Sequence, residues 1–157
     1  PMVVKEAFGS FGKQVYLVKS REELRNIVDK IGFKPFLIQK YIKSSCGRDV
    51  RVYVVGDKVV CRMLRVNKND FRSNVSGGGE AFPFEENAEI DNAALLACRA
   101  LGTDFAGVDV MFGENSPVVC EVNSNPHFRS ALTATGVNLA DYIIDYIVNK
   151  ITAKADI

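Results

Sequence analysis

The sequence predicts an α+β fold in which most strands pair in an antiparallel manner. Apolar strand-like runs occur in pairs joined by short glycine-containing turns, which is typical of hairpins. Other segments carry apolar residues at intervals of three and four, which predicts amphipathic helices. With 157 residues, 47% of them hydrophobic, the chain has the size of one ordinary domain and can bury about two thirds of its unfolded surface.

Up to residue 42 the sequence predicts three strands and one helix. The turn between the first two strands runs from Gly9 to Gly12. Ser20 and Glu23 have the spacing of a capping box, which marks the start of a helix, and Gly32 marks its end. The expected strands cover residues 3–5, 14–18 and 36–42.

After residue 42 the sequence predicts two further hairpins and two helices. Gly56 and Asp57 form a two-residue turn that suits a tight hairpin. Residues 67–80 form a long polar loop, and loops of this length are more often functional or disordered than inert. Helices are expected at residues 86–101 and after Asn138, which has the N-cap position of the last helix. The expected strands cover residues 49–55, 58–66, 105–112 and 118–123.

Charge and cysteine content narrow the range of functions. A net charge of +1 gives no basis for binding nucleic acid or an anionic membrane, and no apolar run approaches the ~18 residues of a membrane span. The four cysteines are widely spaced and form no CxxC pair. We therefore expect reduced thiols in a cytoplasmic protein, and neither disulfides nor a zinc site. They are Cys46, Cys61, Cys98 and Cys120.

Two neighbouring strands carry oxygen-bearing side chains that suit a metal ion. Glu121 and Asn123 lie two residues apart in the run 118–123, so both side chains point to the same face. An antiparallel pairing with the run 105–112 brings Asp109 beside them. Three such groups in otherwise buried strands are costly unless a charge lies between them, and their oxygens suit a hard cation such as Mg²⁺. The alternative is that each polar side chain has its own hydrogen-bond partner.

Lys5 ends the first expected strand, just before the glycine-containing turn. Glycines let backbone amides turn toward a phosphate, and the lysine supplies a positive charge. The spacing is not that of a Walker loop, and a plain flexible hairpin explains the same residues. Lys40 and Tyr41 close a strand at a connector, where exposed backbone groups can pair with an adenine base. A simple strand end is equally compatible with them.

Other polar residues have a simpler explanation. Asp49 and Arg51 alternate with valines, and we expect them to pair in a surface or cleft salt bridge that contributes little to stability. Arg72 and Asn74 lie near three consecutive glycines and suit a phosphate or carboxylate, although a loop arginine is commonly only solvated. His127 is the single histidine. No nucleophile motif adjoins it, which favours a structural role and argues against a hydrolase triad.

Taken in order, these segments resemble the ATP-grasp superfamily, and within it the RimK-like carboxylate–amine ligases. The matching strings are VVKEAFGSFGKQV, QKYIKSSCGRDVRVYVVGDKVV, FRSNVSGGG, LGTDFAGVDVMF, CEVNSNPHF and ATGVNLADYIIDYI, which span almost the entire chain. The resemblance implies an ATP-grasp fold that holds a nucleotide between two α+β subdomains. Residues 1–42 would be part of the clamp subdomain, without its beginning, and residues 43–157 the C-terminal subdomain with the metal site.

The resemblance also implies roles for individual residues. The glycine-containing turn corresponds to a flexible loop over the phosphates. Arg72 and Asn74 correspond to a catalytic pair that faces the phosphates and an acyl-phosphate intermediate. The positions that match nucleotide-binding residues are Lys5 (phosphate), Gly9, Ser10 and Gly12 (loop), Lys40 and Tyr41 (adenine hinge), Asp49 (ribose), Arg72 and Asn74. The positions that match metal ligands are Asp109, Glu121 and Asn123, which would hold two ions, either Mg²⁺ or Mn²⁺.

The implied reaction converts a carboxylate and ATP into an acyl phosphate, which an amine attacks to form an amide or peptide bond. Small-molecule or peptide carboxylates and amines are the expected substrates, with glutamate-type amino-acid ligation as the leading subclass. One alternative is a kinase that uses the same clamp to phosphorylate a hydroxyl group. A second alternative is a module that binds ATP without turnover.

The sequence departs from the family pattern at three places. Lys40 stands where relatives usually have an acid. Asn125-Pro126-His127 replaces the more common Ser-Pro-Gly, so we expect His127 to narrow the acceptor side. The chain begins at Pro1, inside the expected clamp subdomain. We therefore expect a piece of a longer polypeptide, whose N-terminal part is its partner, and association into a homo-oligomer is a further expectation.

Overall fold

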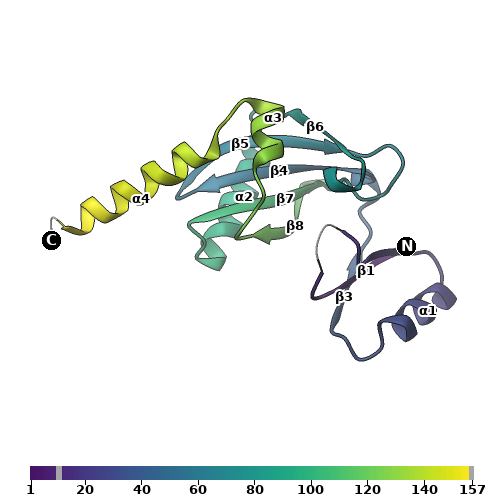
Figure 1. The fold of residues 1–157 in the computed structure, drawn as a ribbon. Helices are drawn as coiled ribbons and strands as arrows, with labels where there is room; N and C mark the ends of the chain where they lie inside the picture. Colours follow the sequence, from purple (N-terminus) through teal and green to yellow (C-terminus); the bar gives the residue numbers. More distant parts are fainter. Residues whose placement is uncertain (10–11, 156–157) are drawn as a thin grey trace.

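The structure, a computed structural model, describes residues 1–9 and 12–155. Its strands form two antiparallel sheets that lie side by side (Figure 1). The small sheet has the strand order β2-β1-β3, and the large sheet has the order β6-β5-β4-β7-β8. Residues 41–47, which include a 3₁₀ turn at Lys43–Ser45, connect the two sheets. The predicted α+β fold with mostly antiparallel strands is confirmed.

The small sheet is built from the N-terminal segment. Helix α1 (Arg21–Ile31) covers one face, where Val4, Val18 and Ile31 form a small core. The predicted N-cap is confirmed, because the backbone N–H of Glu23 donates to Oγ of Ser20 at 3.1 Å. The strands are β1 (Met2–Glu6), β2 (Val15–Val18) and β3 (Phe36–Lys40).

Both faces of the large sheet are partly covered by helices. Valines at alternate positions of the central strands pack against α2 (Ala88–Leu101). The opposite face carries Tyr53 and Met63, which pack beneath α3 (Arg129–Thr135) and the start of α4 (Leu139–Ala155). The strands are β4 (Arg48–Val55), β5 (Lys58–Val66), β6 (Glu80–Pro83), β7 (Phe105–Phe112) and β8 (Pro117–Asn123).

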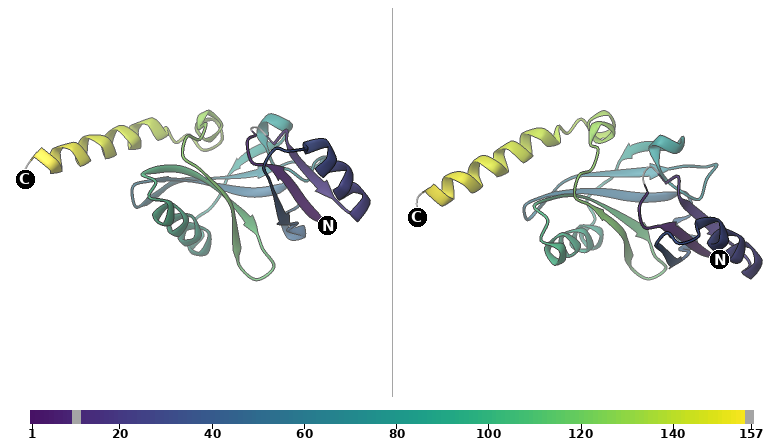
Figure 2. Two further views of the ribbon diagram at one scale, coloured as in Figure 1. Left: turned by 90° about the horizontal axis from the view of Figure 1, so that it is seen from below. Right: turned by 60° about the horizontal axis from the view of Figure 1, so that its bottom comes forward.

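Helix α4 projects away from the sheets in every view (Figures 1 and 2). It is attached near its middle, where the Tyr146 hydroxyl donates to Oδ1 of Asp104 at 2.7 Å and Lys150 donates to Oδ2 at 2.6 Å. Ile144 and Ile151 are more than half exposed on this helix. None of the helices in the described ranges has the length and apolar character needed to cross a membrane.

Three elements differ from the predicted ones. The strand expected at residues 36–42 ends at Lys40. Strand β6 (Glu80–Pro83) was not predicted; it begins at the last residue of the expected loop 67–80, and it forms because it pairs with the outer edge of β5. Helix α3 was not predicted, because it has only seven residues and no side chain caps its N-terminus.

Candidate functional site

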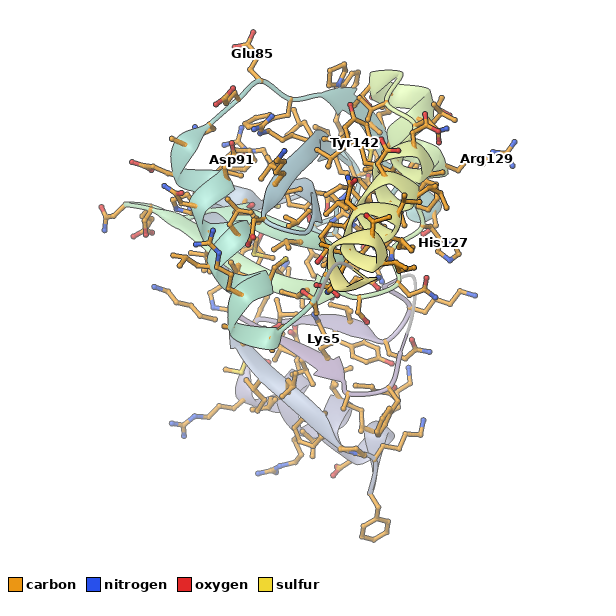
Figure 3. All side chains as sticks on the ribbon, turned by 90° about the vertical axis from the view of Figure 1, so that its left-hand side faces the viewer. Lys5, Glu85, Asp91, His127, Arg129 and Tyr142 are labelled. Carbon is orange, nitrogen blue, oxygen red and sulfur yellow. The ribbon has the colours of Figure 1, made fainter. Side chains whose placement is uncertain are left out.

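A cavity of about 1040 Å³ lies between the small sheet and the ends of the large-sheet strands. Lys5, labelled in Figure 3, lies where the two sheets meet. Eleven of the twelve predicted site residues line this cavity, and the twelfth, Ser10, lies outside the described residues. The eleven are Lys5, Gly9, Gly12, Lys40, Tyr41, Asp49, Arg72, Asn74, Asp109, Glu121 and Asn123.

The cavity has an excess of basic side chains. Six lysine or arginine residues and four carboxylates line it. Because most of these charges lie between two sheets, where water screens them less, the excess positive charge favours a polyanionic ligand. The basic residues are Lys5, Lys40, Arg48, Arg51, Arg65 and Arg72, and the acidic residues are Glu6, Asp49, Asp109 and Glu121.

The three predicted metal ligands come together on one face of the β7–β8 hairpin. Asp109 pairs directly with Glu121, and Gly107 pairs with Asn123. A β-bulge at Cys120 makes this possible, because the register shifts by one residue between Asp109 and the next pair. Without the extra residue, Asp109 would pair with Cys120, and the Glu121 side chain would point to the opposite face of the sheet.

Glu121 and Asn123 already have hydrogen-bond partners. Nζ of Lys5 donates to Oε2 of Glu121 at 3.1 Å, which joins the small sheet to the large one. Oδ1 of Asn123 accepts a hydrogen bond from the backbone N–H of Asn125 at 3.0 Å. Burial by itself would lower the pKa of Lys5, but Cys120 and Glu121 outweigh it, and the pKa lies above its usual value. Lys5 is therefore held in its charged form.

Asp109 lies in a buried network of charges. Arg51 donates to both carboxylate oxygens, at 2.6 and 2.8 Å, and Nη2 of Arg65 lies 2.8 Å from Oδ2. Arg65 also donates to both oxygens of Asp49, at 2.7 and 2.5 Å. Burial by itself would raise the pKa of Asp109, but the two guanidinium groups outweigh it and lower the pKa. Asp109 is therefore ionised and charge-paired.

The expected pairing of Asp49 with Arg51 is wrong. Asp49 pairs with Arg65 across the β4–β5 hairpin, and Arg51 pairs with Asp109 across β4–β7. Asp49 and Arg65 are 6% and 4% exposed, so this is a buried network and not a surface salt bridge. Ser73 adds a side-chain hydrogen bond to Asp49, whose pKa burial raises.

Arg65 and Ser73 were missed as site residues. Arg65 follows Cys61 and Met63 at two-residue intervals in β5, so alternation alone places all three on one face. A charged residue that continues an apolar face is a detectable signal. Ser73 lies between Arg72 and Asn74, which were both predicted as site residues. Its position between them was the only indication in the sequence that it belongs to the site.

A loop from the large sheet closes over the cavity beside the glycine-containing turn. Nη1 of Arg72 donates to the carbonyl oxygen of Gly12 at 2.5 Å. The backbone at Gly12 has φ +69°, and a Cβ there would lie 2.8 Å from Oδ1 of Asn74, so any other residue would be strained and would displace the Asn74 amide. Oε1 of Gln14, which lines the same cavity, is buried and has no hydrogen-bond partner among the described residues.

The connector between the sheets provides an aromatic wall. The rings of Tyr41 and Phe71 meet edge to face at 6.5 Å between centroids, and a hydrogen bond with Cys46 raises the pKa of Tyr41 to about 12. His127, labelled in Figure 3, also lines the cavity. The buried Tyr53 hydroxyl donates to its backbone carbonyl at 2.9 Å and fixes that segment.

Sequence comparison accounts for this arrangement. The model of the family described as the RimK-like ATP-grasp domain matches residues 1–147. The chain belongs to the RimK-like ATP-grasp family. One curated relative, probable alpha-L-glutamate ligase 2 of Shewanella amazonensis, is 37% identical over 157 residues, which cover 98% of this chain and 52% of the relative. The chain thus spans about half the length of the curated relatives it matches.

Solved ATP-grasp structures have the same fold. D-alanine–D-alanine ligase from Bacillus anthracis complexed with ATP superposes with a TM-score of 0.73 at 24% identity, covering 98% of this chain and 54% of that one. The ATP-grasp ligase PsnB, complexed with Mg, ADP and a phosphomimetic variant of its minimal precursor, superposes with a TM-score of 0.72 at 20% identity. The alignment covers 96% of this chain and 46% of PsnB. The expected ATP-grasp fold is confirmed.

Proposed function

We propose that the polypeptide containing this chain is an ATP-dependent carboxylate–amine ligase. The observation that carries the proposal is the convergence of the described predicted residues on one net basic cavity between two sheets. Family membership supports the reaction class, and the alpha-L-glutamate ligase relatives favour an amino acid such as glutamate as one substrate. The division into residues 1–42 and 43–157 as two subdomains is part of the same proposal.

ATP is the nucleotide we assign to the cavity. Lys5 and Arg72 supply positive charge for the phosphates from opposite sheets, and the turn at Gly12 allows close backbone approach. The aromatic wall formed by Tyr41 and Phe71 suits a planar base. Gln14 offers an unpartnered acceptor to a donor on a bound molecule. Asp49, which lies in the buried network with Arg65, is a less direct ribose contact than the family resemblance implies.

A divalent cation fits part of the predicted ligand set. Carboxylate and amide oxygens are the ligands of Mg²⁺ and Mn²⁺, and Glu121 and Asn123 place such oxygens in the cavity. Asp109 fits less well, because two guanidinium groups occupy its oxygens. The described residues contain no group of three or more histidine, cysteine or acidic side chains suited to a metal. We therefore propose Glu121 and Asn123 as the principal ligands, with Asp109 shared with Arg51 and Arg65.

Binding and charge stabilisation are the chain's contributions to the reaction. A bound divalent cation would neutralise phosphate charge during phosphoryl transfer. A substrate carboxylate oxygen forms a bond to the γ-phosphorus as the bond to ADP breaks. The amine nitrogen then attacks the acyl carbon, loses a proton and displaces phosphate. Arg72 and Asn74 lie where donors can stabilise negative charge on the transferring group.

The ligase, kinase and ATP-binding-module hypotheses predict different phosphate release. The experiment incubates the intact polypeptide with Mg²⁺-ATP and amino-acid carboxylates, with and without amines, and measures inorganic phosphate. Release that requires both the carboxylate and the amine supports the ligase. Phosphate retained on a hydroxyl acceptor, without amine dependence, would replace it with the kinase. Nucleotide binding without turnover under all conditions would replace it with the module.

A further inference from the structure

Asp70 lies next to the cavity but does not line it. The main cavity is lined by Arg72 and Asn74, whereas Asp70 lines a smaller neighbouring cavity of about 420 Å³. Arg72, Asn74 and Ser76 line both cavities, so they form the wall between the two. Asp70 therefore makes no direct contact with the main cavity, and its contacts reach that cavity through neighbours in this wall.

The carboxylate of Asp70 fixes the guanidinium group of Arg72. Nε of Arg72 donates to Oδ1 at 3.1 Å, and Nη2 donates to Oδ2 at 2.6 Å. The backbone N–H of Arg72 also donates to Oδ1, at 2.9 Å. A guanidinium group is planar and its donors have fixed directions, so pairing along one edge determines where the remaining nitrogen points. That nitrogen, Nη1, donates to the carbonyl of Gly12.

The backbone that carries Asp70 is anchored to the large sheet. The N–H of Gly47, just before β4, donates to the carbonyl of Phe71 at 2.9 Å, and the N–H of Asn67 donates to the carbonyl of Gly47 at 2.7 Å. At Gly47, with φ +67°, a Cβ would lie 2.3 Å from the carbonyl oxygen of Asn67 and 2.7 Å from that of Asp70. The loop that carries Asp70 therefore packs directly on the backbone of Gly47. This contact gives Asp70 a fixed position from which to orient Arg72.

We propose that Asp70 is a positioning residue, which orients Arg72 and thereby holds the turn at Gly12 over the cavity. The chain of contacts runs from the large sheet through Asp70 and Arg72 to the small sheet. These contacts keep Arg72 at the wall of the cavity. Its Cζ also lies over the Phe71 ring, 5.5 Å from the ring centroid. The proposal rests on the proposed function only in taking the cavity to bind phosphates, and the contacts themselves do not depend on it.

Hydrogen–deuterium exchange on the nucleotide-free chain tests this proposal separately from ATP binding. In Asp70→Asn the amide keeps the size of the carboxylate but loses its charge and one acceptor. We expect peptides that span residues 6–14, which contain Gly12 and the hydrogen bond from the Glu6 N–H to the Gln14 carbonyl, to exchange about five- to tenfold faster. Peptides from α1 should exchange as in the wild type. Asp70→Glu, which keeps the carboxylate, should restore much of the protection.

Asp91→Asn is the matched control. Asp91 accepts two hydrogen bonds from Arg62, at 2.6 and 2.5 Å, and it lies at the end of α2 away from the small sheet in the view of Figure 3. This variant removes an equivalent bidentate pair and should not change exchange at Gly12. Unchanged exchange at Gly12 in Asp70→Asn would overturn the proposal. Faster exchange in all peptides would also overturn it, because Asp70 would then be a general stabilising residue.

A binding measurement distinguishes this proposal from the proposed function. If Mg²⁺-ATP binds the wild type, Asp70→Asn should weaken binding about threefold to tenfold, because Arg72 is no longer held in place. If ATP does not bind the wild type but exchange at Gly12 responds to Asp70, the proposed function fails and the positioning role stands. If ATP binds and exchange does not respond, the positioning role alone fails.

Discussion

Arg65 is the residue whose loss should destabilise the chain most clearly. It is 4% exposed and bonds to two buried carboxylates, those of Asp49 and Asp109. Substitution by methionine preserves the length of the side chain and removes the charge. Asp109 keeps its pairing with Arg51, whereas Asp49 loses its bidentate partner.

The expected loss follows from the burial of these groups. Removing one partner of a buried ion pair costs about 3–5 kcal/mol, because the remaining charge stays uncompensated. For a chain of 157 residues, a change of ~1 kcal/mol shifts the melting temperature by about 3 °C. Arg65→Met should therefore melt about 9–15 °C below the wild type. The open cavity beside the network admits water, which favours the lower end of this range.

Calorimetric melts at pH 7 without ligands measure this shift. Arg99→Met is the control, because Arg99 is 60% exposed and lies 3.6 Å from an exposed carboxylate of Asp57. It should melt within about 2 °C of the wild type. Adding Asp49→Asn to Arg65→Met should recover part of the loss, since it removes the uncompensated charge. Equal shifts for Arg65→Met and Arg99→Met would refute the argument that the buried network stabilises the fold.

Three further outcomes are expected. Gly47→Ala should destabilise the fold by about 3 kcal/mol, because the new Cβ clashes with the backbone and the φ is positive. Gly78 has φ +92° and open space around it, so Gly78→Ala should cost only ~1 kcal/mol. Equal losses in urea unfolding would show that the clash at Gly47 has no effect. Tyr53→Phe should lose about 1 kcal/mol, because it removes the hydrogen bond to the His127 carbonyl; unchanged calorimetric melting would contradict this. The hydrogen bond from Arg72 lowers the pKa of Asp70. The stabilisation that Asp70 provides is therefore complete above its usual pKa of about 3.9 and lost as the pH falls through the lower folded value. Urea unfolding should find the wild type more stable than Asp70→Asn at pH 5–8 and the difference shrinking below about pH 4.

Local signals predicted most of the elements. The capping box placed the start of α1, and Gly56–Asp57 placed the β4–β5 turn. Short elements without local signals were missed. Strand β6 depends on pairing with β5, and α3 depends on packing against the large sheet, as the buried Ala131 indicates. Contacts between distant parts of the chain decide such elements, and no window of sequence contains them.

The sequence predicted which face of a strand each site residue occupies, but it did not predict which charged residues pair with each other. Two-residue alternation placed Glu121 and Asn123 on one side of β8. A simple continuation of the tight turn would pair Asp49 with Leu64, and a bulge in the β4–β5 hairpin instead brings Arg65 opposite Asp49. The bulge at Cys120 has the same effect on the partner of Asp109. Because neither bulge has a glycine or proline to mark it, the charge pairs followed from the structure alone.

The proposed function depends on binding of Mg²⁺-ATP in the cavity between the sheets through Glu121. A thermal melt of this chain with and without Mg²⁺-ATP measures this binding, on the wild type, on Glu121→Gln and on Glu114→Gln. Glu114 lies in the exposed turn of the same hairpin and serves as the control.

At a hundredfold excess over the dissociation constant, a ligand of the folded state adds about 2.7 kcal/mol of stability, or about 8 °C in melting temperature. We expect this shift in the wild type and in Glu114→Gln, and its loss or strong reduction in Glu121→Gln. A cooperative melt that Mg²⁺-ATP does not shift in the wild type, or shifts equally in all three, would rule out binding of Mg²⁺-ATP through Glu121.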